Sequence, residues 1–185
     1  MDPTVKPQDL LLALYFASRR ETGRAPTYID LGRALGLSHG EVHNAHRRLA
    51  GAGLVRSPSG MEVHRAALCE FLLHGVRYVF PAERGSPGRG LPTAHSAPPL
   101  VSELAGEALP IVWPWARGEV YGETLKPLYP SVPEAAASDA ELYRALALVD
   151  ALRVGRARER TLAQTHIRAL LRMPAASRSD ASDEP

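Results

Sequence analysis

The chain has 185 residues, 45% of them apolar, which is enough to bury the core of one large or two small domains. Its formal net charge of +2 excludes coating of nucleic acid by bulk charge alone. The single cysteine, Cys69, excludes an intramolecular disulfide and a cysteine-based zinc site. Because Cys69 lies in the apolar stretch AALCEFLL, we expect a buried core thiol rather than a redox sensor.

Positive charge is concentrated near the start. Residues 1–65 carry nine Lys and Arg against six Asp and Glu, whereas the remainder carries thirteen against fourteen. The first eight residues have neither the basic start nor the apolar centre of a signal peptide. No apolar run approaches the roughly 20 residues that span a membrane. We therefore expect a cytoplasmic protein without a membrane partner.

Residues 7–20 form an apolar-rich run that predicts a first helix. In residues 27–55 the apolar side chains recur at helical spacing, with one break between two further helices. Gly36 stands at that break, where a turn between crossed helices requires a positive φ. Ser38 then opens the second of these helices, and Glu41 completes a Ser-x-x-Glu capping box. This order predicts a helix-turn-helix.

Two glycines, Gly51 and Gly53, suit the end of the second of these helices. Residues 54–56, 57–60 and 61–64 then predict a strand, a tight turn and a second strand. Three helices followed by a hairpin resemble the winged helix-turn-helix transcription regulators, and SHGEVHNAHRRLAGAGLV is MarR-like. The resemblance covers residues 7–65. It implies a DNA-binding domain over residues 1–65, with double-stranded DNA as its partner.

Beyond this region, residues 76–80 predict a short strand. Seven prolines in residues 81–114 predict an extended excursion with a mobile tip at residues 84–90. Residues 111–121 predict two short strands around residues 116–118, which join residues 76–80 in a small sheet. Residues 127–133 predict a rigid extended stretch.

Ser138 and Glu141 predict the capped start of a long helix. Its apolar stripe, from Leu142 to Val154, suits either a dimer surface or packing inside one body, and Gly155 predicts a bend or break. Residues 156–172 continue as a basic helix, whose arginines suit a solvated face, DNA phosphates or an acidic partner. Residues 66–174 thus predict a dimerisation, partner-binding or ligand-sensing domain, and residues 175–185 a disordered tail. The expected class is α+β, mainly α.

In the helix-turn-helix interpretation, the recognition helix Ser38–Ala50 enters the major groove. Asn44 matches adenine and Arg47 matches guanine, because both side chains can form two hydrogen bonds with those bases. Gly40 allows close approach of the backbone, and His46 lies beside the core, where we expect a structural role. The residues expected to contact DNA are Thr27, Tyr28, Ser38, His39, Gly40, His43, Asn44, Arg47, Arg48 and Arg56.

Within that set, Arg48 and Arg56 are expected at phosphates, and Thr27 and Tyr28 at the DNA backbone. His39 and His43 suit bases or phosphates. The alternative is that these side chains form the solvated face of a helix, or that the domain docks a protein.

No motif predicts an enzyme or a cofactor. His39 and His43 have the i, i+4 spacing of a zinc pair, but a third ligand is missing, so no metal is expected. The Gly-rich residues 85–90 lack the Lys-Ser/Thr of a phosphate-binding loop. Trp113 and Trp115 suit either a ligand pocket or, more often, a core.

The expected function is a sequence-specific DNA-binding transcriptional regulator, a repressor that acts as a homodimer. The alternative is an antitoxin-like or adaptor protein, whose C-terminal part binds a toxin-like enzyme and whose DNA binding is autoregulatory or absent. The segments GVRYVFPAERG, PTAHSAPPL and PLYPSVP resemble bacterial transcriptional regulators found near toxin–antitoxin or nucleotidyltransferase genes. That resemblance implies an association with such systems.

Overall fold

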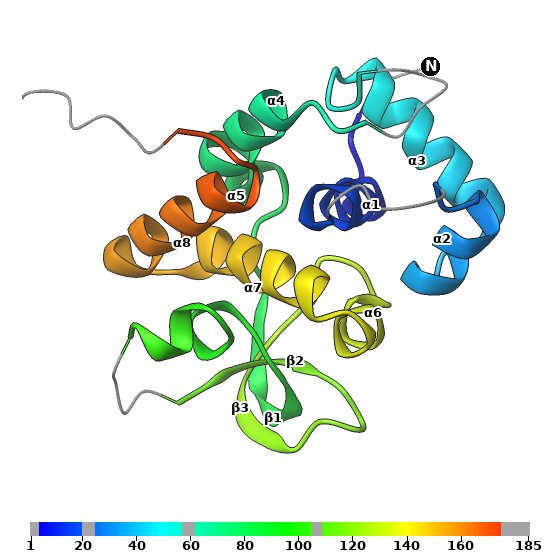
Figure 1. Ribbon diagram of the computed structural model, residues 1–185. Helices are drawn as coiled ribbons and strands as arrows, with labels where there is room; N and C mark the ends of the chain where they lie inside the picture. The colour runs from blue at the N-terminus through cyan, green and yellow to red at the C-terminus, as the bar shows by residue number, and fades with distance from the viewer. Residues whose placement is uncertain (1–3, 20–24, 57–61, 105–108, 175–185) are drawn as a thin grey trace, which may run out of the picture.

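The computed structural model describes residues 4–19, 25–56, 62–104 and 109–174. The chain has the expected class, α+β and mainly helical, and its strands lie at one end of the molecule (Figure 1). The helices are α1 Pro7–Ser18, α2 Tyr28–Leu35, α3 His39–Gly51, α4 Arg65–Glu70, α5 Val76–Val79, α6 Val132–Ser138, α7 Ala140–Val154 and α8 Ala157–Leu170. The strands are β1 Arg84–Pro92, β2 Ile111–Pro114 and β3 Val120–Leu125. No helix among the described residues is long and apolar enough to cross a membrane.

Helix α1 is buried on all sides. Leu10, Leu11, Leu12, Ala13 and Leu14 have no exposed surface. Such a helix needs neighbours around its whole circumference, because each apolar face must leave water. It packs against α2 and α3 on one side and against α7 on another, so it lies between the N-terminal and C-terminal helices (Figure 1).

The predicted turn between the second and third helices is confirmed. Gly36 has a φ of 64°, in the left-handed region. A Cβ built on Gly36 would also lie 2.7 Å from the Cβ of Ser131, so both backbone and space require glycine. The Ser38–Glu41 capping box is confirmed as well, since each residue's side chain accepts a hydrogen bond from the other's backbone N–H.

Two short segments pair after α3. Val55 and Val63 form an antiparallel bridge. The amide of His64 donates to the carbonyl of Leu54, and that of Arg56 to the carbonyl of Glu62, both at 2.9 Å. The predicted turn at residues 57–60 lies outside the described residues, as does the predicted tail at residues 175–185.

The predicted strand at residues 76–80 is wrong. Helix α4, a π-helical turn over Phe71–Gly75 and α5 follow one another without interruption. The β-branched and aromatic side chains favour a strand locally, but Val76 is buried where α5 packs against α7. Tertiary packing therefore overrides β propensity here.

The predicted mobile tip at residues 84–90 is also wrong, because these residues belong to β1. Strand β1 pairs antiparallel with both β2 and β3, which pair parallel with each other, and the three strands close a small barrel. Of the two strands predicted within residues 111–121, the first is β2, whereas the second, β3, begins at Val120 and runs on to Leu125. In the sheet, β1 takes the place predicted for residues 76–80. A Cβ on Gly90 would lie 1.9 Å from the carbonyl oxygen of Trp113, so the closure depends on glycine.

The predicted capped helix exists, but Ser138 does not cap it. Ser138 ends α6, and Asp139 caps α7 by accepting hydrogen bonds from the amides of Glu141 and Leu142. Helix α6 also occupies part of the stretch predicted to be extended at residues 127–133. The chain breaks at Gly155 between α7 and α8, as expected.

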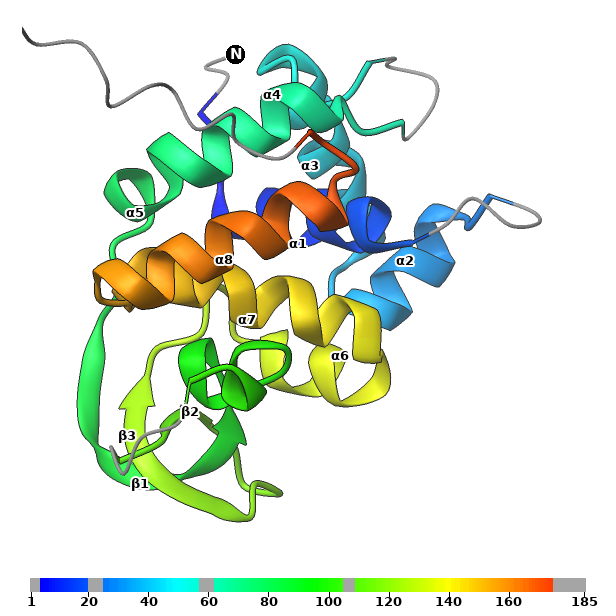
Figure 2. The ribbon, with the colours of Figure 1, turned by 60° about the vertical axis from the view of Figure 1, so that its left-hand side comes forward.

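The apolar stripe on α7 is packed inside one body. Its residues Leu142, Ala145, Leu146, Val149 and Leu152 are at most 3% exposed. Helix α7 contacts α1, α6 and α8, and Figure 2 shows it enclosed between α8 and the 3₁₀ turns that follow β1. This stripe therefore supplies no dimer surface. Cys69 is buried as predicted, and its burial raises the pKa of the thiol.

A buried polar cluster joins the barrel to α7. The carboxylate of Asp150, 1% exposed, accepts hydrogen bonds from Trp113 Nε1 at 2.6 Å, Thr93 Oγ1 at 2.9 Å and Arg153 Nη1 at 2.6 Å. Arg153 also donates to the carbonyl of Phe80 at 2.7 Å. Burial raises the pKa of Asp150, while the charge of Arg153 and the hydrogen bonds oppose that shift.

We expect Asp150→Ala to lower the free energy of unfolding by about 3–5 kcal/mol, because it leaves Arg153 buried without its partner. Urea unfolding followed by circular dichroism measures the change. Glu83→Ala is the control, because it breaks an exposed ion pair with Lys126 and should cost less than about 1 kcal/mol. Equal losses in the two variants would show that the buried cluster does not stabilise the fold.

Candidate nucleic-acid interface

Helix α3 presents a polar face to solvent. Val42, Ala45 and Leu49 point into the core, with at most 1% of their surface exposed. The opposite face carries exposed residues, as the helical spacing predicts: His39, Gly40, His43, Asn44 and Arg47. The strands lie at the far end of the molecule from this face in both ribbon views (Figures 1 and 2).

Asn44 and Arg47 occupy the middle of this face. Neither side chain makes a hydrogen bond or an ion pair with any residue in the described part of the chain. Both are hydrogen-bonding groups held on a rigid helix, and each can bind an external partner without first losing an internal one.

Tyr28 and three histidines form a ring cluster where α2 meets α3. The centroid of the Tyr28 ring lies 5.7 Å from that of His39, 5.9 Å from that of His43 and 6.1 Å from that of His46. His46 is 3% exposed and its Nδ1 lies 2.8 Å from the Tyr28 hydroxyl, in agreement with the structural role expected for a residue beside the core. Tyr28 is half-buried, and its hydroxyl is hydrogen-bonded to His46.

Thr27 and Ser38 both serve as helix caps. Thr27 Oγ1 accepts from the amide of Asp30 at 3.2 Å and donates to its carboxylate at 2.7 Å. Ser38 Oγ accepts from the amide of Glu41 at 3.2 Å. The side chains of these two exposed residues fix the starts of α2 and α3. Next to Ser38, Gly40 has no heavy atom within 4 Å of the position a Cβ would take, so the backbone there is open to solvent.

Arg48, unlike Arg47, is not an exposed arginine. Its Nε and Nη2 atoms donate to the two carboxylate oxygens of Asp9, at 2.7 and 2.6 Å, and Asp9 is fully buried. Only 14% of the Arg48 side chain is exposed. This two-point pair joins α3 to α1, so the guanidinium expected at a phosphate instead holds the helix in place.

Arg56 directly follows Val55 of the Val55–Val63 bridge, and its amide donates to the carbonyl of Glu62. Its side chain is 58% exposed, and its Nη1 lies 3.4 Å from Glu62 Oε1. An exposed pair at that distance contributes little stability, so Arg56 can exchange Glu62 for another anion at low cost.

Three supporting residues were not predicted: Asp9, Tyr129 and Ser131. Tyr129 donates its hydroxyl to Glu41 at 3.2 Å, and Ser131 donates to the carbonyl of Leu35 at 2.5 Å. Hydrogen bonds from Ser38, with a smaller contribution from Tyr129, lower the pKa of Glu41. The segment before α6, which contains Tyr129 and Ser131, thus stabilises the turn between α2 and α3.

The metal site and the tryptophan pocket considered in the sequence find no support in the described residues. Within the described ranges, no group of three or more His, Cys, Asp or Glu residues is placed to hold a metal ion. Trp113 is 1% exposed and belongs to the core, whereas the ring of Trp115 lies under the guanidinium of Arg117, 4.7 Å away.

Comparisons with known proteins return nothing: no family model, no curated protein and no solved structure matches the chain.

We expect two adjacent arginines of α3 to differ sharply in their effect on stability. Arg48→Ala should lower the free energy of unfolding by about 3–5 kcal/mol, because the buried Asp9 loses its guanidinium partner. Arg47→Ala should change it by no more than about 0.5 kcal/mol, because Arg47 is exposed and makes no hydrogen bond or ion pair with the described residues. Urea unfolding of both variants measures the difference, and a mild effect in both would contradict the role given to the Asp9–Arg48 pair.

Proposed function

We propose that residues 7–65 form a winged helix-turn-helix and that the protein is a sequence-specific DNA-binding transcriptional regulator. The observation that carries the proposal is the face of α3, where Asn44 and Arg47 are exposed and uncommitted beside His39 and His43. The glycine turn and the capping box before α3 support it, as does the Val55–Val63 bridge after the helix.

The dimensions of α3 suit the major groove of DNA. An α-helix with its side chains is about 10–12 Å in diameter, and the groove is about 12 Å wide. The 13 residues of α3, about 20 Å long, can therefore lie in the groove. In the proposed complex, Asn44 pairs with adenine and Arg47 with guanine, while His39 and His43 reach bases or phosphates. Arg56 contacts phosphate from the proposed wing, and the open backbone at Gly40 approaches the DNA most closely.

As part of the same proposal, the regulator is cytoplasmic, acts as a repressor and binds a two-fold symmetric operator as a homodimer. Two copies of α3 double the number of base contacts and set the spacing between half-sites. The dimer interface must involve a surface other than the α7 stripe, which is buried inside one chain.

We expect specific binding to the DNA upstream of the protein's own gene. Fluorescence anisotropy with that fragment and with a scrambled fragment, over a salt series, separates base readout from charge attraction. Arg47→Ala and Asn44→Ala should each weaken binding to the upstream fragment by about tenfold or more, since a two-point base contact contributes about 1–3 kcal/mol.

Arg158→Ala is the matched control for Arg47→Ala. It removes the same charge from an exposed position on α8 and should leave the affinity for the upstream fragment nearly unchanged. Equal losses in both arginine variants, together with a steep salt dependence and equal binding to scrambled DNA, would reduce the interaction to charge attraction. Absence of binding to either fragment would favour the adaptor or antitoxin-like alternative, which copurification of a partner enzyme would then identify.

Gly40→Ala distinguishes an effect on DNA affinity from an effect on stability. The added methyl group meets no atom within 4 Å and alanine favours helix, so we expect stability to stay the same or to rise by up to about 1 kcal/mol. Affinity for the upstream fragment should nevertheless fall, because the methyl group projects into the proposed contact with DNA. Unchanged affinity in anisotropy titrations would show that the backbone at Gly40 does not approach the DNA closely.

A further inference from the structure

A cavity of about 620 Å³ opens between the end of α1, the segment around Pro98–Ser102, α7 and α8. Its volume lies within the range of about 300–1,000 Å³ that is typical of small-molecule sites. The cavity is lined by four separate parts of the chain, so the fold as a whole sets its shape. None of the residues expected to contact DNA lines it.

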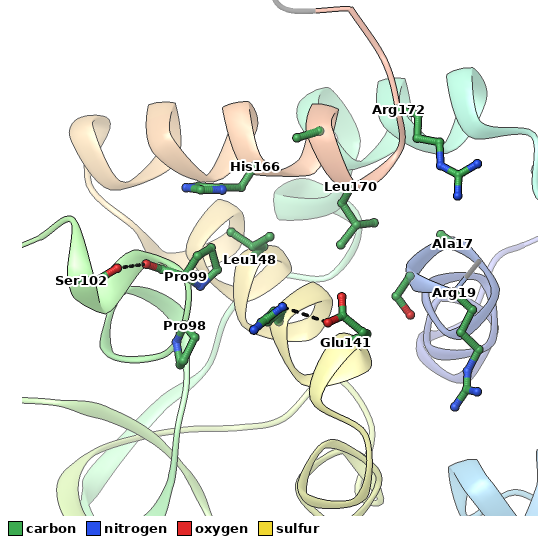
Figure 3. Close-up of a pocket in the computed structure, with 13 residues that line it drawn as sticks. Ala17, Arg19, Pro98, Pro99, Ser102, Glu141, Leu148, His166, Leu170 and Arg172 are labelled. Atoms are coloured by element: carbon green, nitrogen blue, oxygen red, sulfur yellow. Dashed lines mark hydrogen bonds and ion pairs between the residues drawn. The ribbon is translucent and has the colours of Figure 1, made fainter.

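One part of the lining is apolar. Leu148 of α7 and Ala17 of α1 are each 2% exposed, and Leu170 of α8 is half-buried. Figure 3 shows Leu148 and Leu170 near the centre, with Pro98 and Pro99 on one side and Ala17 on the other. This surface can bury the apolar body of a ligand.

The other part of the lining is cationic. Arg19, Arg144 and Arg172 surround the cavity together with His166, and Glu141 is the one carboxylate among the lining residues. The guanidinium of Arg172 makes no hydrogen bond or ion pair with any residue in the described part of the chain. Its side chain extends from the end of α8 toward Ala17 of α1 (Figure 3).

The remaining basic side chains have internal partners at the rim. Arg144 Nη1 lies 2.9 Å from Glu141, Arg19 Nη2 lies 2.5 Å from Asp139, and His166 Nε2 lies 2.5 Å from Glu103. The side chains of Arg144 and Arg19 are about half exposed, so their pairs add little stability and can be exchanged. Arg172 is therefore the cation best placed to take a new anion, with Arg144 as the second.

We propose that this cavity binds a small amphipathic organic anion. Arg172 holds the carboxylate of the ligand through two parallel hydrogen bonds, and Arg144 supplies a second positive charge. The apolar body of the ligand packs on Leu148, Leu170 and the two prolines. This proposal is independent of DNA binding, because the site and α3 share no residue.

Isothermal titration calorimetry of the full chain with 1-naphthoate tests the proposal, with neutral 1-naphthamide as the matched ligand. We expect saturable binding of the carboxylate and an affinity for the amide about tenfold or more weaker, because the amide forms no charge-assisted hydrogen bonds with the arginines. Equal affinities for the two ligands, or no heat from the carboxylate at millimolar concentration, would overturn the proposal.

Arg172→Asn locates the site. Arg172 has a φ of 55°, and asparagine tolerates this left-handed conformation better than most residues. We expect the variant to weaken 1-naphthoate binding about tenfold or more, whereas Arg158→Asn, which removes the same charge from α8 outside the cavity, should leave it unchanged. Equal effects in the two variants would assign the binding to net charge. Circular dichroism checks folding, and Arg144→Gln provides an independent second loss within the cavity.

Discussion

The complete burial of α1 is the constraint on which the rest of the structure depends. Five consecutive residues without exposed surface cannot be covered by one partner, so α3 and α7 must both pack against this helix. One continuous hydrophobic core therefore runs from the N-terminal helices through α7 to the barrel. The position of α3 is fixed by residues far away in the sequence as well as by its own neighbours.

Polar contacts add orientation to this apolar packing. The two-point pair between Asp9 and Arg48 sets how α3 lies on α1, because both guanidinium and carboxylate are planar and directional. Tyr129 and Ser131, in the segment before α6, bind Glu41 and Leu35 on either side of the turn between α2 and α3. Precise presentation of a helix face requires such supports, since a contact that misses by an ångström loses most of its hydrogen-bond energy.

The sequence predicted local features well and long-range features poorly. The Gly36 turn, the Ser38–Glu41 box and the burial of His46 depend on residues close in sequence, where spacing determines geometry. The role of Arg48 was not predictable, because its partner Asp9 lies 39 residues away in the sequence and nothing local shows that Asp9 is buried. Residues 76–80 became helix and residues 84–92 became strand for the same reason: packing on α7 and closure of the barrel are tertiary effects.

Burial of α1 also affects how the chain folds as it is made. Helix α7, which covers one side of α1, begins at Ala140, more than a hundred residues after Pro7. At translation rates of about 5–20 residues per second, α1 waits on the order of ten seconds for that partner. During this interval the side of α1 that α7 later covers stays exposed. Chaperones can bind this exposed apolar surface of the newly made chain.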